Sequence, residues 1–410
     1  MKFEKLGNIA SISAGQGAPQ LETDFSDKGH PFIRAGHLGD LLKGENELNL
    51  PKINEEISKK YKLKLYPKGT IVFAKSGMSA TKGRIYQLKN SCYLVNHLAI
   101  IGSKECVNSD FLVFALRKYS PVKLINDSSY PSISQGAIEN LQIPFPSISD
   151  QLHIANILSQ AENLIARRKE SIRLLDEFLK STFLEMFGDN AKMSNSKVEE
   201  LGSNISYLTS GSRGWAQYYS QNGAKFLRIQ NIGEGIIRTD NLIFVNPPNS
   251  AETERTRVKE GDLIISITAD LGRTSVVPKN FGEAYINQHL ALIRLNANIN
   301  PVYAAYFYNL PFGNNAIQRK NRSAVKAGLN FNDIKSFPIV IPSFERQTQF
   351  AQIVESTEVI KAQYQSSLQE LESLYGSLSQ LAFKGELGAK DGEMMMAAEA
   401  KGTYQNKTNS

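Results

Sequence analysis

Two histidines occupy matching positions in two similar apolar stretches, Asn96-His97-Leu98-Ala99-Ile100 and Asn287-Gln288-His289-Leu290-Ala291. An imidazole can act as a general acid or base near neutral pH, so the pair could indicate a function that two sites share. A histidine inside an apolar strand is more often a hydrogen-bonded framework residue. We favour that interpretation for both residues.

Other stretches that resemble catalytic motifs are incomplete. Asn246-Pro247-Pro248-Asn249 is similar to the Asn-Pro-Pro-aromatic motif with which amino-methyltransferases hold a flipped adenine, but Asn249 lacks the stacking ring, so a turn is the better interpretation. Gly15-Gln16-Gly17 lacks the third glycine, the following helix and the acidic residue of a dinucleotide-binding loop. The sequence contains neither a Gly-Lys-Ser/Thr phosphate loop nor a His-Glu-x-x-His metal motif. We therefore predict a binding protein that is not an enzyme and has no catalytic residues.

The composition is that of a soluble globular protein. The chain has 410 residues, of which 41% are hydrophobic and 21% charged, which allows two or three domains. No apolar run approaches the ~18 residues that a membrane helix needs, so we expect no membrane association and a cytoplasmic location. Cys92 and Cys106 lack CxxC spacing and a nearby histidine pair. We expect both to be buried small hydrophobes, and we expect no disulfide, no metal and no cofactor.

The charge favours an anionic partner without proving one. The net charge is +7, and cations gather in two runs: Lys59, Lys60, Lys62, Lys64 and Lys68 in the first half, and Arg319, Lys320, Arg322 and Lys326 in the second. Such runs are more often solvated faces than binding surfaces unless another feature indicates a polyanion.

Two long stretches, residues 150–188 and 346–385, have the apolar spacing of coiled-coil helices. In the first, residues recur at alternating steps of four and three, at Ile154, Leu158, Ala161, Ile165, Arg168, Ile172, Leu175, Leu179, Thr182 and Met186. A shift of roughly 196 positions reproduces a weaker seam in the second stretch. Each helix would be about 50 Å long. We predict that the seams bury each other, the alternative being that each helix packs only on its own domain.

The segments before the two helices repeat one plan. Residues 1–149 and 197–343 share an ordered series of short strand-like stretches and turns, such as Phe32-Ile33-Arg34 with Phe226-Leu227-Arg228. Residues between the matched positions differ widely. We therefore predict two similar α+β domains, each followed by a long helix, and a disordered tail over residues 388–410. Two similar but unlike domains suit a partner that itself repeats, such as duplex DNA.

The matched stretches resemble the DNA specificity subunit of type I restriction-modification systems. The residues that carry the resemblance are Gly261-Asp262-Leu263-Ile264 through Gly272-Arg273, Asn287 to Ala291, Ile339 to Gln347, and Ala382 to Leu387, with weaker counterparts in the first half. The resemblance covers residues 1 to about 387. It implies two target-recognition domains held apart by an antiparallel pair of long helices, related by a pseudo-two-fold internal repeat.

The resemblance also implies a function. A specificity subunit binds double-stranded DNA at a site of two unlike halves, without catalysis of its own. It assembles with two adenine-methylating subunits and with restriction subunits that use ATP to translocate and cut DNA. Two other functions remain open from the residues alone: a methyltransferase or nuclease fragment with unrecognised motifs, and a coiled-coil scaffold that binds no nucleic acid.

The candidate site residues fall into two groups. Candidates for DNA contact are polar loop residues beside the matched positions: Lys75, Ser76, Lys82 and Arg84 in the first domain, and Arg228, Thr268 and Arg273 in the second. Candidates for contact with the methylating subunits are apolar residues beside the helix seams, which we expect to be exposed: Ile157, Leu164, Phe178, Ile353 and Ile360.

Overall fold

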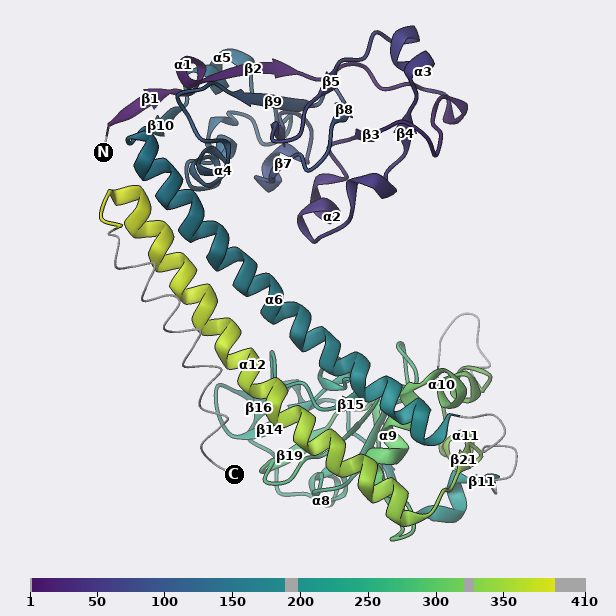
Figure 1. The fold of residues 1–410 in the computed structure, drawn as a ribbon. Helices are drawn as coiled ribbons and strands as arrows, with labels where there is room; N and C mark the ends of the chain where they lie inside the picture. The colour runs from purple at the N-terminus through teal and green to yellow at the C-terminus, as the bar shows by residue number, and fades with distance from the viewer. Residues whose placement is uncertain (1, 189–197, 321–327, 388–410) are drawn as a thin grey trace. The chain divides into compact units, whose positions relative to one another are not determined.

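The computed structural model describes residues 2–188, 198–320 and 328–387 (Figure 1). They belong to two compact units: the first unit comprises residues 1–168 with 367–410, and the second unit comprises residues 169–366. The tail that we predict to be disordered, 388–410, lies outside the described residues, as do Arg322 and Lys326 of the second basic run.

The first unit contains two four-stranded sheets and one strand pair. The first sheet has the order β2 (Ala10–Ala14), β9 (Leu98–Ser103), β6 (Ile71–Ala74) and β7 (Ile85–Gln87). The second has the order β4 (Lys52–Ile53), β3 (His30–Ile33), β8 (Cys92–Leu94) and β5 (Leu65–Tyr66). β1 (Phe3–Lys5) pairs with β10 (Gln142–Pro144). The short helices are α1 (Leu6–Ile9), α2 (Leu38–Leu42), α3 (Glu55–Lys60), α4 (Ser109–Lys118) and α5 (Gln135–Glu139).

The second unit repeats this arrangement. Its larger sheet has the order β12 (Ile205–Ser210), β20 (Leu290–Leu295), β17 (Leu263–Ser266), β18 (Thr274–Val276) and β15 (Gly235–Ile236). The other has the order β13 (Tyr219–Ser220), β16 (Ile243–Val245), β14 (Ala224–Leu227) and β19 (Ala284–Ile286). β11 (Val198–Glu200) pairs with β21 (Pro338–Val340). The short helices are α8 (Ala251–Thr256), α9 (Pro301–Asn309), α10 (Pro311–Gln318) and α11 (Phe331–Lys335).

The central strand β6 is apolar along its whole length because both faces of the sheet are covered. In β6, Ile71 and Phe73 belong to one hydrophobic cluster, whereas Val72 and Ala74 belong to another. β17 alternates in the same way between two clusters of the second unit. Successive side chains of a strand point to opposite faces, so one apolar run supplies two cores.

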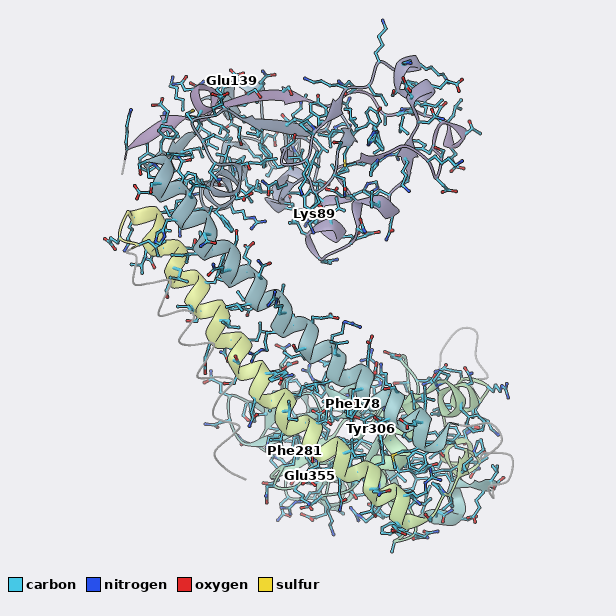
Figure 2. The ribbon with its side chains drawn as sticks, viewed as in Figure 1. Lys89, Glu139, Phe178, Phe281, Tyr306 and Glu355 are labelled. Carbon is cyan, nitrogen blue, oxygen red and sulfur yellow. The ribbon has the colours of Figure 1, made fainter. Side chains whose placement is uncertain are left out.

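Two long helices, α6 (Ile148–Phe187) and α12 (Phe344–Lys384), complete the cores of both units (Figure 1). The start of α6 and the end of α12 enter the core of the first unit. The end of α6 and the start of α12 enter the core of the second unit, where the ring centroids of Phe183 and Phe350 lie 5.2 Å apart. Tyr306 of α9, which is labelled in Figure 2, packs on Phe350. The helices are therefore antiparallel, as predicted.

Two buried glutamines show how closely the units match. The Gln151 side chain is buried at the start of α6, where it accepts from Asn108 N at 2.9 Å and donates to Pro146 O at 3.0 Å. Gln347, at the start of α12, accepts from Asn300 N at 2.8 Å and donates to Pro342 O at 2.9 Å. Two bonds of the same kind in the same places confirm the internal repeat.

The cysteines differ from the sequence prediction in one respect. Cys92 is buried, but Cys106 is exposed. Cys106 lies in the turn after β9, where the chain has already left the core. Both thiols are free.

Candidate nucleic-acid interface

In the first unit, one loop carries all four candidate residues. It begins directly after β6, where Lys75 N donates to His97 O at 2.9 Å. Ser76 Oγ lies 2.7 Å from His97 Nδ1. Lys82 is exposed and ends a short 3₁₀ helix, Ala80–Lys82, that closes at Gly83 with φ of 60°. The loop thus places the Ser76 hydroxyl beside the His97 ring and carries the exposed Lys82 six residues further along the chain.

The side chain of Arg84, the last residue of this loop, packs against α2. A Cβ placed on Gly39 would lie only 2.7 Å from Arg84 Cζ, so the guanidinium occupies the space that the glycine leaves open. The half-buried side chain is therefore held by packing as well as by its charge.

In the second unit, the corresponding loop follows β17. Thr268 Oγ1 lies 2.6 Å from His289 Nδ1, and the second imidazole nitrogen lies 2.9 Å from Gln288 Nε2. Arg273 forms an ion pair with Asp270 of the same loop while 40% of its side chain remains exposed. The loop therefore neutralises part of its own charge.

Arg228 directly follows β14. It lies next to the turn before β20 that contains His289, because Leu227 O accepts from Asn287 N at 3.0 Å. Its Nη2 donates to Asn241 O at 3.0 Å. Its Nε is buried and has no partner among the described residues. Arg228 and Thr268 thus flank the turn that holds His289.

Sequence reasoning missed Arg34, the counterpart of Arg228 in the first unit. Its guanidinium lies 5.3 Å from the ring centroid of Phe25, and it lines a cavity of about 420 Å³ together with Phe32 and His37. Burial lowers the pKa of His37, and the nearby Arg34 charge lowers it further. The signal was available in the match between Phe32-Ile33-Arg34 and Phe226-Leu227-Arg228.

Both histidines are framework residues in the sense that each ring contacts a hydroxyl in the loop after the neighbouring strand. They do not lie inside strands, however, but in the turns before β9 and β20, and His97 is exposed. The apolar residues that follow each histidine are the buried strand, which explains why the pattern suggested a strand position.

Part of the first basic run is neutralised by its neighbours. Lys59 Nζ lies 2.7 Å from Glu55 Oε1, and Lys60 Nζ lies 3.0 Å from the buried carboxylate of Asp24. The Tyr61 hydroxyl and Lys60 both lower the pKa of Asp24, so the carboxylate stays charged beside them. These lysines are less available to an anionic partner than their number suggests.

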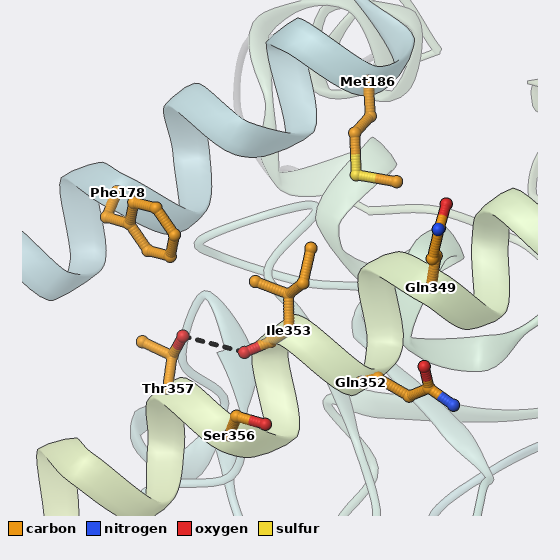
Figure 3. Close-up of a pocket in the computed structure, with 7 residues that line it drawn as sticks. All are labelled: Phe178, Met186, Gln349, Gln352, Ile353, Ser356 and Thr357. Atoms are coloured by element: carbon orange, nitrogen blue, oxygen red, sulfur yellow. Dashed lines mark hydrogen bonds between the residues drawn. The ribbon is translucent and has the colours of Figure 1, made fainter.

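The second unit has an open apolar cavity of about 690 Å³ between its two long-helix segments (Figure 3). Phe178 and Met186 of α6 face Ile353 of α12 there, and Thr357 donates to Ile353 O at 2.8 Å. Phe178 is 48% exposed and Ile360 40% exposed, whereas Ile353 and Leu164 are half-buried. Ile157 is only 2% exposed because it packs in the core of the first unit, so the expectation that it is exposed is wrong.

Residues 2–188, 198–320 and 328–387 contain neither a metal-binding cluster nor a membrane-spanning helix. In these ranges, no three His, Cys, Asp or Glu side chains gather in a way that could hold a metal ion. None of the helices described there is long and apolar enough to cross a membrane.

Both halves of the chain match one known protein family. The type I restriction modification DNA specificity domain matches residues 1–174 and again residues 192–372. The chain belongs to this family. Each match covers one set of sheets with its adjoining part of a long helix, so the two family domains coincide with the internal repeat.

Individual relatives agree with this assignment. The type I restriction enzyme EcoBI specificity subunit from Escherichia coli is 20% identical over 420 residues, which cover 94% of this chain and 86% of that protein. The type I restriction enzyme MjaIX specificity subunit from Methanocaldococcus jannaschii is 32% identical over 148 residues, which cover 35% of this chain and 34% of that protein.

A solved structure shows the same fold. The crystal structure of a type I restriction-modification S subunit from M. genitalium matches with a TM-score of 0.59 at 16% identity, covering 93% of this chain and 95% of that chain. The specificity-domain fold of this chain is therefore two similar α+β domains with two long antiparallel helices.

Proposed function

We propose that this chain is the subunit that reads an asymmetric, split DNA site for a type I restriction-modification complex. The observation that carries the proposal is the duplicated loop frame: β6 and β17 each lead into a loop held by a hydroxyl–imidazole contact, Ser76 with His97 and Thr268 with His289. Both loops end in Gly-Arg, at Gly83-Arg84 and Gly272-Arg273, but the residues between the hydroxyl and this pair differ in number and type. A shared frame with different polar side chains suits two readers of different sequences.

The roles of the candidate residues follow from their chemistry. Lys75 and Lys82 would contact phosphates, which fixes the position of the duplex without reading its sequence. Arg84, Arg228 and Arg273 can make paired hydrogen bonds to a guanine edge in the major groove. The hydroxyls of Ser76 and Thr268 can reach a base edge or position the loop.

The long helices would dock the partner subunits. Exposed or half-buried apolar residues on their surface, Leu164 in the first unit and Phe178, Ile353 and Ile360 in the second, supply apolar area for contact with two adenine-methylating subunits. Restriction subunits would join the assembled complex. In this proposal, the chain itself contributes DNA recognition and positioning, and the partners contribute the chemistry.

The proposal is tested by selecting DNA duplexes from a random pool with the complex of this chain and its methylating subunit. We expect enrichment of two unlike words at a constant separation. A complex that enriches no sequence even at low salt would favour a scaffold, and binding of a methyl donor by the isolated chain would favour an enzyme.

A single substitution assigns one word to the second unit. Arg273→Ala should reduce enrichment of one word and leave the other unchanged, because Arg273 lies in the loop of the second unit only. Loss of a direct contact to a base pair costs about 1–3 kcal/mol. Lys279→Ala is the control, since Lys279 is a 71% exposed cation of the same unit that pairs with Glu355 on α12. Equal loss of both words would show that Arg273 has a structural role.

A further inference from the structure

The hydroxyl–imidazole contacts occupy equivalent places in the two units. In the first unit, the residue before the hydroxyl, Lys75, donates its backbone N–H to His97 O at 2.9 Å. In the second unit, Ile267 N donates to His289 O at the same distance of 2.9 Å. Each histidine therefore holds the start of the loop twice, once through its backbone and once through its ring.

A third segment holds the same point from the other side. Ile133 N donates to Lys75 O at 2.8 Å, and Leu329 N donates to Ile267 O at 2.9 Å. Single residue bridges, Ser76 with Ser132 and Thr268 with Gly328, continue these contacts. The hydroxyl residue thus lies between two segments that are distant in sequence, which makes it a fixed point of the loop.

The backbone reverses immediately after this fixed point. Gly77 and Ala269, the residues that follow Ser76 and Thr268, have φ angles of 71° and 57°. A left-handed conformation is costly for alanine, so Ala269 keeps it only because the surrounding contacts impose it. The direction in which each loop leaves the sheet is therefore set at the hydroxyl residue.

The second unit adds a further link. Gln288 Nε2 is an amide donor, so a neutral His289 ring that accepts from it carries its proton on Nδ1 and donates to Thr268 Oγ1. The chain Gln288, His289, Thr268 then has one defined proton arrangement. In the first unit, His97 is exposed, and its ring contacts Ser76 Oγ through Nδ1.

We propose that Ser76 with His97 and Thr268 with His289 are positioning pairs, each of which aims one recognition loop at its own half of the DNA site. The pairs act through the loop that they hold and do not themselves read bases. This inference rests on the proposed function and adds to it the residues that set specificity in each unit independently.

The test measures how well the complex with the methylating subunit discriminates each half of its split site. Duplexes carry the full site, the first half altered or the second half altered. Thr268→Val removes the hydroxyl while keeping the shape, and should reduce discrimination of the second half roughly 3- to 10-fold, the range for loss of one neutral hydrogen bond. Discrimination of the first half should not change. Ser76→Ala should give the reciprocal result.

Conservative exchanges and a double-mutant cycle separate positioning from direct contact. Thr268→Ser and Ser76→Thr keep the hydroxyl and should retain discrimination within about twofold. His289→Ala should reduce discrimination of the second half by the same factor as Thr268→Val. The double variant should show no larger reduction than either single variant, because all three remove the same contact. Additive losses, or equal losses at both halves, would overturn the inference. Thermal unfolding of each variant identifies general misfolding.

The wild-type result distinguishes this inference from the proposal on which it rests. If the wild-type complex discriminates neither half, the proposed function fails. If the wild-type complex discriminates both halves, and the Thr268→Val and Ser76→Ala complexes discriminate both halves equally well, the proposed function stands and the positioning pairs are refuted.

Discussion

The turns before β6 and β17 show how the two units share a backbone and differ in side chains. Thr70 N donates to Pro67 O at 3.2 Å, and Asp262 N donates to Lys259 O at 3.1 Å, so the turns have the same shape. In the first unit, the Thr70 hydroxyl closes the turn on Pro67 O. In the second, the buried Asp262 carboxylate closes the turn by accepting from Lys259 N at 2.6 Å, and it also binds the guanidinium of Arg294 through two contacts of 2.8 Å.

The same contrast appears where the long helices meet. In the first unit, Tyr375 donates to Glu162 at 2.9 Å, and Arg117 joins the same carboxylate. In the second unit, Lys361 forms an ion pair with Asp176. Backbone geometry is therefore the constant part of the repeat, and side-chain charge is the part that varies. A protein built in this way can change what one unit binds without changing how it folds.

The largest effect should come from the glycines that allow two backbones to approach. A Cβ on Gly15 would lie 2.2 Å from Leu94 O, and one on Gly211 would lie 2.1 Å from Asn287 O. Each alanine variant should destabilise its own unit by about 4 kcal/mol or more, because rigid backbone has to move. Gly17→Ala is the control, since nothing lies within 4 Å of a Cβ there. Fluorescence of Trp215, the single tryptophan, reports on the second unit, and hydrogen exchange reports on the first.

If Gly15→Ala and Gly211→Ala had different costs in their own units, the shared backbone would be a weaker constraint than proposed. A cost from Gly17→Ala as large as that from Gly15→Ala would mean that the close approach is not the cause.

An intermediate effect should distinguish the two turns. Asp262→Asn removes the charge that Arg294 binds and should destabilise the second unit by about 2–3 kcal/mol. The cost is below that of breaking a fully buried ion pair because water still reaches about a third of the Arg294 side chain. Thr70→Val should cost the first unit only about 1 kcal/mol, the value of one neutral hydrogen bond. Denaturant unfolding followed separately in each unit measures both. Equal costs would contradict the view that the second turn depends on charge.

The smallest difference should be seen at the buried glutamines. Gln151→Ala and Gln347→Ala each remove the partner of one part-buried backbone N–H and one part-buried carbonyl, so each should cost its unit about 2 kcal/mol. The two values should agree within about 0.5 kcal/mol because the bonds are alike. Hydrogen exchange at Asn108 and Asn300, whose amides bind the glutamines, should accelerate in the matching variant only.

The long helices and the repeat were predictable from the sequence because both depend on regular spacing. The heptad spacing alone places Leu158 and Leu179 on one face of the helix, and both residues are buried. The seam did not reveal that Ile157 is buried as well, because the domain core covers a face of α6 that the partner helix does not.

The loop contacts were less predictable because they join residues that are distant in the sequence. The sequence identifies Ser76 and Thr268 as polar loop residues beside matched positions, but their pairing with His97 and His289 depends on the register of β6 on β9 and of β17 on β20. Because both faces of β6 are buried, its sequence has no apolar–polar alternation that would fix its register. Arg34 was overlooked for a different reason: only its position after a strand, and no motif of its own, relates it to Arg228.

The most direct test of two units reading two unlike words is a genome-wide map of methyladenine. The map is made in a host that expresses this chain with the methyltransferase subunit proposed as its partner, beside a host that lacks only this chain. The account predicts a split motif with two unlike halves that appears only when the chain is present. An identical methylation pattern in the two hosts, or a motif that consists of one continuous word, would contradict it.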